Sequence, residues 1–250
     1  SPSYPDSATV IAAFSNGVAS SLPVTLYNAE TVSLDISDSV VDSSGDVSYD
    51  ADLTVGPAGA DAAESLVDAA PASVVADGTT TSTVTVTVKD AYGNAIPGML
   101  SSLITISSSG SDNTVTQPSV DTDANGQTTG TIASTMAEEK TVSAEADAVS
   151  ITDTATVTFV PGTASYLTIT ADDTTPTAGG SFNVEITAYD AYDNVKTDYD
   201  PSGLTYTFSG PSDSPNLTSP SYPDSATVIA AFSNGVADSL PVTLYNAETV

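Results

Sequence analysis

The sequence predicts an all-β protein in which tandem β-sandwiches form an elongated array. Three observations support this fold class. A segment of 32 residues occurs twice, runs of residues alternate between apolar and polar, and steps rich in Asn, Pro and Gly separate those runs. The first observation predicts the array, and the other two predict the sandwiches.

The repeated segment sets the period of the array. Residues 1–32 return as residues 219–250 at an offset of 218, and the copies differ only where Ser20 is replaced by Asp238. A segment that returns almost unchanged marks a tandem repeat. We therefore expect these 250 residues to be a window on a longer array, cut inside a domain at both ends.

Alternating residues predict strands with one dry face and one wet face. In the run 82–89, three valines alternate with three threonines, and residues 47–55, 154–159 and 182–187 likewise alternate between apolar and polar. Such alternation is typical of antiparallel sandwiches rather than of parallel sheets. Hairpin turns are expected at Asn16-Gly17, Asn125-Gly126, Asn234-Gly235 and residues 43–46. The one helix candidate is residues 59–70, ended by Pro71.

Two junctions rich in Pro and Gly, residues 55–59 and 160–164, divide the chain. Residues 59–161 are predicted to be one complete domain, called type A. Residues 1–58 are then the C-terminal part of a second domain type, called type B, and residues 162–250 are the N-terminal part of the next type-B domain. The length of type A suits a sandwich of about seven strands.

Several short motifs resemble one family in their order and spacing. Residues 84–94 end in Asp90-Ala-Tyr-Gly-Asn94, and Asp190-Ala-Tyr-Asp-Asn194 matches that loop 100 residues later. Together with Pro97-Gly98 and residues 122–127, they resemble the bacterial immunoglobulin-like domains of intimin- and invasin-type adhesins. The resemblance implies immunoglobulin-like sandwiches and a place on the bacterial cell surface. The second loop departs from the pattern, because Asp193 replaces Gly93.

Composition excludes several classes of function. The chain has 32 acidic and 3 basic residues, with a formal net charge of −29. Nucleic acids and anionic membrane surfaces attract clustered Lys and Arg, so neither is an expected partner. No apolar run is long enough for membrane insertion in this window. The absence of His and Cys removes Ser-His-Asp triads, thiol nucleophiles and ordinary zinc sites, so we expect no enzyme.

Calcium is the candidate cofactor, at or near the domain junctions. Asp172 and Asp173 follow one junction, and Asp190 and Asp193 lie in a dense acidic stretch of the next type-B domain. A divalent cation would relieve the repulsion between such carboxylates. The alternative is that these side chains only cap their own turns. Residues 121–126 suit a hairpin turn better than a calcium loop, because the twelfth position is Ile132.

Near-identical repeats supply length and spacing rather than distinct chemistries. The predicted function is a structural repeat unit of an extracellular bacterial surface protein, a stalk or fibre segment for adhesion or surface architecture. Its expected partners are neighbouring repeats and other copies in a fibre. Two alternatives stay open: a subunit of a self-assembling extracellular filament or sheath, and an adhesin module that binds glycan or protein.

Overall fold

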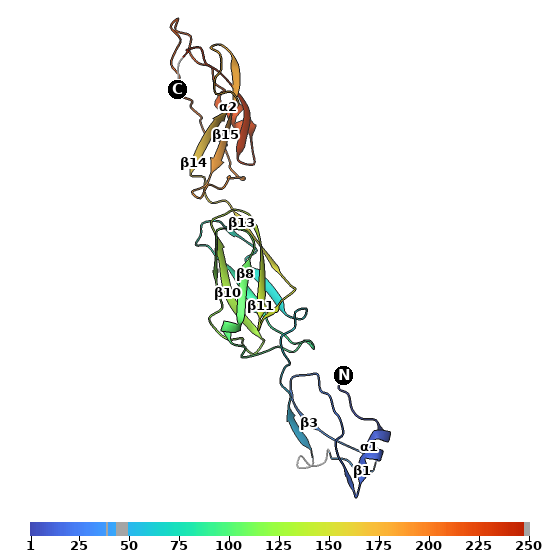
Figure 1. The fold of residues 1–250 in the computed structure, drawn as a ribbon. Helices are drawn as coiled ribbons and strands as arrows, with labels where there is room; N and C mark the ends of the chain where they lie inside the picture. Colours follow the sequence, from blue (N-terminus) through green and yellow to red (C-terminus); the bar gives the residue numbers. More distant parts are fainter. Residues whose placement is uncertain (39, 44–49, 248–250) are drawn as a thin grey trace.

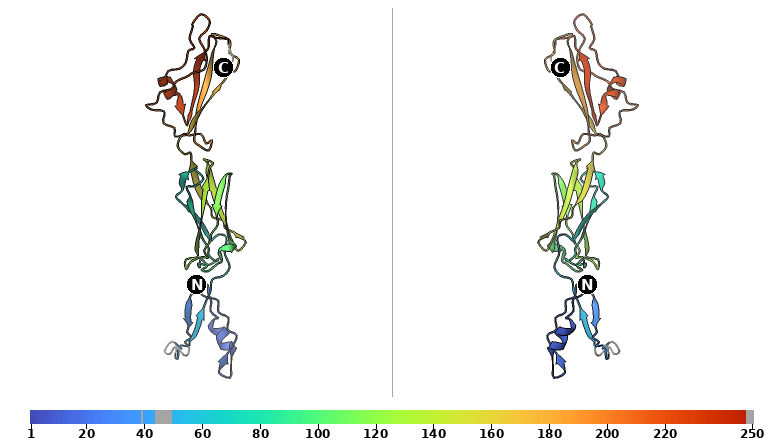
Figure 2. Two further views of the ribbon diagram at one scale, coloured as in Figure 1. Left: turned by 90° about the vertical axis from the view of Figure 1, so that its left-hand side faces the viewer. Right: turned by 90° about the vertical axis from the view of Figure 1, so that its right-hand side faces the viewer.

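The computed structural model describes residues 1–38, 40–43 and 50–247. These residues form three units that follow one another along an elongated molecule, as two further views confirm (Figures 1 and 2). Strands hold 39% of the residues and helices 7%, so the predicted all-β array is confirmed. The expected turn at residues 43–46 and the expected strand at residues 47–55 include residues 44–49, which lie outside the described residues.

The central unit is a sandwich of two sheets. The first sheet has the order β5-β7-β10-β9, and the second has the order β12-β11-β13-β6 with β8 also paired to β11. A short 3-10 helix, Ser101–Leu103, precedes β8. The strands are β5 Leu66–Ala70, β6 Ser73–Val75, β7 Ser82–Thr87, β8 Ile104–Ser108, β9 Asn113–Thr116, β10 Gln127–Ser134, β11 Glu139–Ala146, β12 Val149–Ser150 and β13 Ala155–Val160.

Alternation along the strands builds the core of this sandwich. In β7 the valines point inward and the threonines outward, and Val84 and Val86 are fully buried. Phe159 of β13 and Val142 of β11 meet them from the second sheet, within one continuous hydrophobic cluster. Burial of each such side chain contributes about 1.5–3 kcal/mol relative to exposure. The core therefore lies between the sheets, while the ends of the sandwich are left for contacts with neighbouring units.

The C-terminal unit contains one sheet with the order β14-β15-β17-β16. Its elements are β14 Tyr166–Ala171, β15 Ser181–Tyr189, α2 Ser225–Ala231, β16 Phe232–Ser233 and β17 Val236–Thr243. A second, smaller core covers one part of this sheet, where Val184, Ile186 and Leu240 are buried beside α2. The order of strands matches the first sheet of the central sandwich, which supports the predicted kinship of the two domain types.

The N-terminal unit contains two hairpins and a short helix. Its elements are α1 Ser7–Ala13, β1 Phe14–Ser15, β2 Val18–Ala19, β3 Thr31–Leu34 and β4 Ala51–Thr54. β1 pairs with β2 across the expected Asn-Gly turn, where Asn16 and Gly17 both have positive φ. β3 pairs with β4 with Val32 opposite Leu53.

The two copies of the repeated segment share local structure but differ in burial. Each helix is capped by an aspartate, Asp6 or Asp224, whose carboxylate accepts a hydrogen bond of 2.7 Å from the third helical residue. In α2 Val228 is fully buried, whereas α1 buries none of its residues. Local sequence thus determines the helix, and packing against β17 buries it only in the second copy.

The helix candidate at residues 59–70 forms only a single turn. Asp61 accepts hydrogen bonds from the backbone N–H groups of Ala63 and Glu64, which closes a single turn. The chain then enters β5, whose five residues pair with β7. Pairing with a neighbouring strand outweighed the helical propensity of an alanine-rich stretch.

Candidate functional site at the domain junctions

The two Asp-Ala-Tyr loops have the same internal geometry. The Oδ1 atom of Asp90 accepts from the backbone N–H groups of Tyr92 and Asn94, both at 2.9 Å. Asp190 repeats this with Tyr192 at 2.8 Å and Asn194 at 3.0 Å. The predicted capping of each loop by its own aspartate is therefore present.

At the first junction the loop also binds the preceding unit. Asp90 Oδ2 accepts from the N–H of Ala58 in the linker at 2.9 Å. The side-chain amide of Asn94 donates to the Tyr27 carbonyl at 2.8 Å and accepts from the Ala29 N–H at 3.0 Å. The rings of Tyr27 and Tyr92 meet edge to face with centroids 4.9 Å apart.

The second junction repeats these contacts with different partners. Asp190 Oδ2 accepts from the N–H of Gly162 at 2.8 Å. Asn194 donates to the Thr135 carbonyl at 2.8 Å and accepts from the Ala137 N–H at 2.7 Å. We call each set, Asp90 with Asn94 and Asp190 with Asn194, a junction clamp. The aspartate holds the linker, and the asparagine holds a loop of the preceding unit.

Hydrogen bonds keep both clamp aspartates ionised. Each is only 1% exposed, and burial alone would raise the pKa of its carboxyl. The neighbouring asparagine side chain, the linker N–H and the loop N–H groups outweigh burial and lower the pKa of Asp90 and of Asp190. The clamp is therefore charged, buried and satisfied at neutral pH.

The structure separates the four predicted calcium residues into two places. Asp172 accepts from Asn183, and Asp173 caps a turn at Thr175, both at the end of β14 that lies far from the junction. Asp190 belongs to the clamp. Asp193, in the same loop, accepts from the Tyr166 hydroxyl, and this bond raises the pKa of the Tyr166 phenol to about 12.

No group of three or more acidic side chains among residues 1–38, 40–43 and 50–247 is placed to hold a metal ion. Calcium at these aspartates stays a prediction. If calcium binds at a junction, millimolar calcium is expected to raise the melting temperature of the chain. A site with a dissociation constant near 10⁻⁴ M would add about 1–1.5 kcal/mol to the free energy of unfolding. Thermal melting with calcium and with EDTA measures this, and equal midpoints would contradict it.

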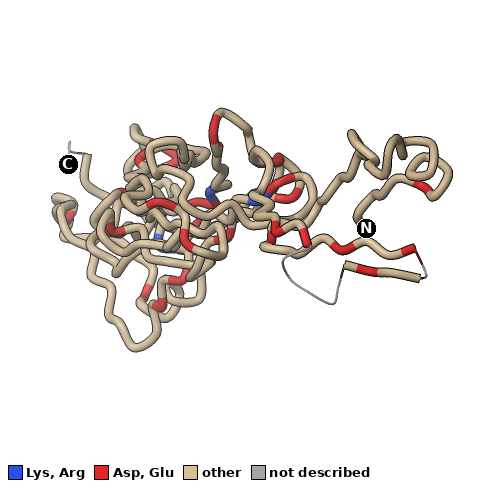
Figure 3. Tube along the Cα trace, turned by 90° about the horizontal axis from the view of Figure 1, so that it is seen from below, with Lys and Arg blue, Asp and Glu red and all other residues tan. Residues whose placement is uncertain are grey.

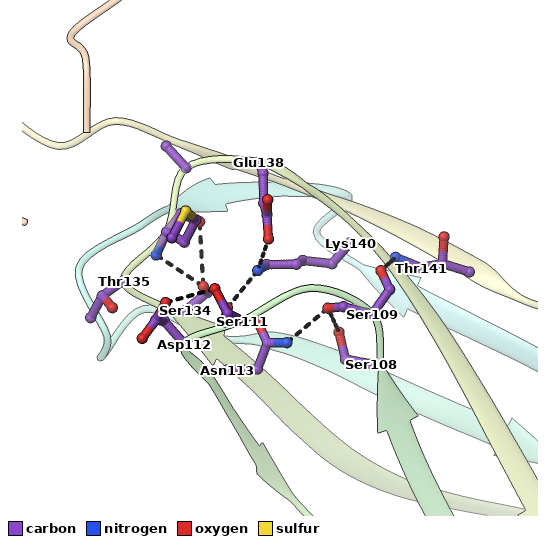
Figure 4. Close-up of polar contacts among 12 residues, drawn as sticks. Ser108, Ser109, Ser111, Asp112, Asn113, Ser134, Thr135, Glu138, Lys140 and Thr141 are labelled. Carbon is purple, nitrogen blue, oxygen red and sulfur yellow. Dashed lines mark hydrogen bonds and ion pairs between the residues drawn. The ribbon is translucent and has the colours of Figure 1, made fainter. Parts of the chain in front are cut away.

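A buried lysine near the second junction was not identified from the sequence. Lys140 is 0% exposed, and its Nζ donates to the Ser111 carbonyl at 2.7 Å and pairs with Glu138 (Figure 4). The pair lowers the pKa of the Glu138 carboxyl. The period-two pattern of β11 carried the signal, because Lys140 lies on the same face of the strand as the buried Val142 and Ala144.

Replacing Glu138 with alanine is expected to lower the melting temperature of the central sandwich by several degrees, because it leaves a buried ammonium without its counter-ion. The double variant Glu138→Ala/Lys140→Met is expected to recover most of that loss, since Met fills a similar volume without charge. Calorimetry of both variants measures this. A double variant no more stable than Glu138→Ala would show that the ion pair is not the cause.

Acidic residues are spread along the whole trace rather than gathered on one patch (Figure 3). In the described part of the chain, no helix has the length and apolarity that a membrane crossing requires.

A groove of about 720 Å³ lies beside the first clamp, with Leu26, Tyr27 and Tyr92 among its lining residues.

A two-sheet sandwich, clamped at both ends to related units, defines a tandem β-sandwich protein. Residues 64–160 match the family model of the bacterial Ig-like domain (group 1). The predicted resemblance to the bacterial immunoglobulin-like domains is confirmed there.

Three similar solved structures are larger than this chain. FdeC, an adhesin of Escherichia coli, is 26% identical over 79% of this chain and 60% of its own, with a TM-score of 0.45. InvD of Yersinia pseudotuberculosis is 25% identical over 58% and 47%, with a TM-score of 0.43. Invasin, a bacterial integrin-binding protein, is 18% identical over 79% and 37%, with a TM-score of 0.48. The comparison with curated proteins gave no match.

Proposed function

We propose that this chain is a spacer segment of an extracellular bacterial surface protein, holding successive sandwiches at fixed separation for adhesion. The observation that carries the proposal is the junction clamp, which appears twice: in each copy the asparagine side chain donates to one backbone carbonyl and accepts from one backbone N–H of the preceding unit. Two different preceding loops, residues 27–29 and 135–137, are held by the same asparagine geometry. A clamp that is reused in this way limits rotation at each linker.

The proposed surface role rests on the match to bacterial Ig-like domains and on the acidic composition of the chain. Bacterial Ig-like domains are a non-enzymatic kind of protein. The high negative charge keeps the units soluble and repels neighbouring molecules, although screening limits this effect to about 8 Å at physiological ionic strength. A soluble array with fixed junctions serves as a stalk.

The test is the width of the distance distribution across a junction. Because the chain has no cysteine, spin labels at Thr116→Cys and Asp238→Cys report the second junction alone. The unmodified junction should give one narrow distribution. Asn194→Ala should broaden it, since two hydrogen bonds of about 1 kcal/mol each are lost between the units.

Asn183→Ala is the matched control, because the Asn183 side chain donates to Asp172 within its own unit. It should leave the distribution narrow. A broad distribution in the unmodified chain would refute a fixed spacer.

A second candidate, a binding module, rests on the groove beside the first clamp, where two tyrosines meet. Tyrosine rings suit stacking against sugars or a peptide. A glycan array probed with the chain tests this, with Tyr92→Ala as the matched variant. Strong signals lost in that variant would favour the module over the spacer.

A further inference from the structure

A buried lysine and a buried amide oxygen lie at one end of the central sandwich, and neither belongs to a clamp. Lys140 is fully buried, and its Nζ donates to the Ser111 carbonyl at 2.7 Å and pairs with Glu138. The Oδ1 atom of Asn113 is buried too, and among the described residues it has no hydrogen-bond partner. An unpaired buried acceptor costs about 1–3 kcal/mol, so its presence in a native core requires an explanation.

The two side chains come from opposite sheets and face the same interior. Asn113 shares the inner face of β9 with Val115, two residues further on, and Lys140 shares the inner face of β11 with Val142. Val115 packs against the hydrophobic cluster that contains Val142. Asn113 and Lys140 therefore enter the same end of the core, one from the first sheet and one from the second.

One loop holds the polar ends of both side chains. Asn113 Nδ2 donates to the Ser109 carbonyl at 2.8 Å, and Lys140 Nζ donates to the Ser111 carbonyl two residues along the same loop (Figure 4). Between these carbonyls lies Gly110, which has a positive φ, and a Cβ atom there would collide with Glu138 and Lys140. Glycine thus lets the loop lie directly against the ion pair.

We propose that the side chains of Lys140 and Asn113 join in an intramolecular isopeptide bond. Glu138 takes one proton from the Lys140 ammonium, which frees the lone pair on Nζ. Nζ then forms a bond to Cγ of Asn113, the Cγ–Nδ2 bond breaks, and Nδ2 leaves as ammonia after receiving a second proton from Nζ. Glu138 releases its own proton to solvent, so the step needs no oxidant and no further reactant.

The surroundings of the three residues suit this step. Groups held in place by a fold react as though at an effective concentration of about 10⁵–10⁸ M, and burial keeps water from competing. Glu138 contacts Nζ directly, and its side chain is 39% exposed, so it exchanges protons with solvent. The unpaired Oδ1 of Asn113 is left to accept from protonated Glu138 as negative charge develops on it. The ion pair is the state before reaction, and the melting of Glu138→Ala concerns that state.

The bond joins the two sheets of the sandwich covalently. It links β9 of the first sheet to β11 of the second and closes a loop over residues 113–140. A closed loop restricts the unfolded chain, as a disulfide does, in a protein that has no cysteine. The inference goes beyond the spacer function, because it needs the interior of one sandwich and not the clamps.

Tryptic digestion with mass spectrometry tests the proposal. The chain has three lysines and no arginine, so trypsin cuts the denatured chain only after Lys89, Lys140 and Lys196. A lysine in an amide bond is not cut. Folded chain incubated at neutral pH and then denatured should give residues 90–196 as one fragment, lighter than calculated by one ammonia. Asn113→Ala should be cut after Lys140, and Glu138→Gln should form the uncut fragment about 100-fold more slowly.

Asn125→Ala is the matched control. The Asn125-Gly126 step can also lose ammonia by closing a succinimide, but that leaves Lys140 open to trypsin. This variant should keep the uncut, lighter fragment, and circular dichroism establishes that Asn113→Ala is folded. Cleavage after Lys140 at full mass in the incubated chain would overturn the proposal. An uncut fragment that persists in Asn113→Ala, or one that is lighter by water instead of ammonia, would also overturn it.

Discussion

Replacing Asp190 with alanine is expected to lower the free energy of unfolding of the C-terminal unit by about 3 kcal/mol. The carboxylate accepts from the N–H groups of Gly162, Tyr192 and Asn194 and from the Asn194 side chain. Each buried donor left without an acceptor costs about 1–3 kcal/mol, offset where water reaches it. Urea unfolding followed by circular dichroism measures the loss.

Asp173→Ala is the control for this variant. It removes the same charge from an exposed turn, where Asp173 accepts from the Thr175 N–H. Its effect should stay below about 1 kcal/mol. Equal losses in both variants would mean that net charge, and not the clamp, determines the result.

The same clamp predicts a dependence on pH. Because its pKa is lowered in the folded state, Asp190 contributes stability at pH values above the unfolded pKa, near 4. That contribution is lost as the pH falls through the lowered folded pKa. As the pH falls from 5 into strongly acidic solution, the free energy of unfolding of Asp190→Ala should therefore decrease less than that of the unmodified chain.

Much of the fold could be predicted because strand alternation and turn residues are local signals. The run 82–89 contains β7, and the turns at Asn16-Gly17 and Asn234-Gly235 join short strands with positive φ at both residues. α1 could not be found this way. Its β-branched Thr9-Val10-Ile11 is typical of a strand, and the Asp6 cap is what turns it into a helix.

The clamps were predicted only in part. The turn that each aspartate caps spans five residues, and the residue types in it are enough to predict it. The bonds that join the units connect Asn94 to a residue 67 positions earlier and Asn194 to one 59 positions earlier. The acceptors of these bonds are backbone carbonyls. Every residue type has one, so the sequence does not indicate which carbonyl will accept the bond. Only the recurrence of the loop after each linker indicated a shared role.

Replacing Phe159 with alanine is expected to lower the free energy of unfolding of the central sandwich by about 3–5 kcal/mol. Phe159 is among the largest fully buried side chains and lies in the cluster formed by both sheets of that sandwich. Removing its ring leaves a cavity that close-packed neighbours fill only in part.

The variant also shows whether the units unfold independently. The C-terminal core, with Val184, Ile186 and Leu240, is a separate cluster that does not include Phe159. In an array of nearest neighbours, the central sandwich should unfold at lower urea while the C-terminal unit keeps its own transition. Hydrogen exchange resolved along the chain distinguishes the two units. A single shared transition would instead mean that the clamp at Asn194 couples them, and that a stalk of such units yields as one body under load.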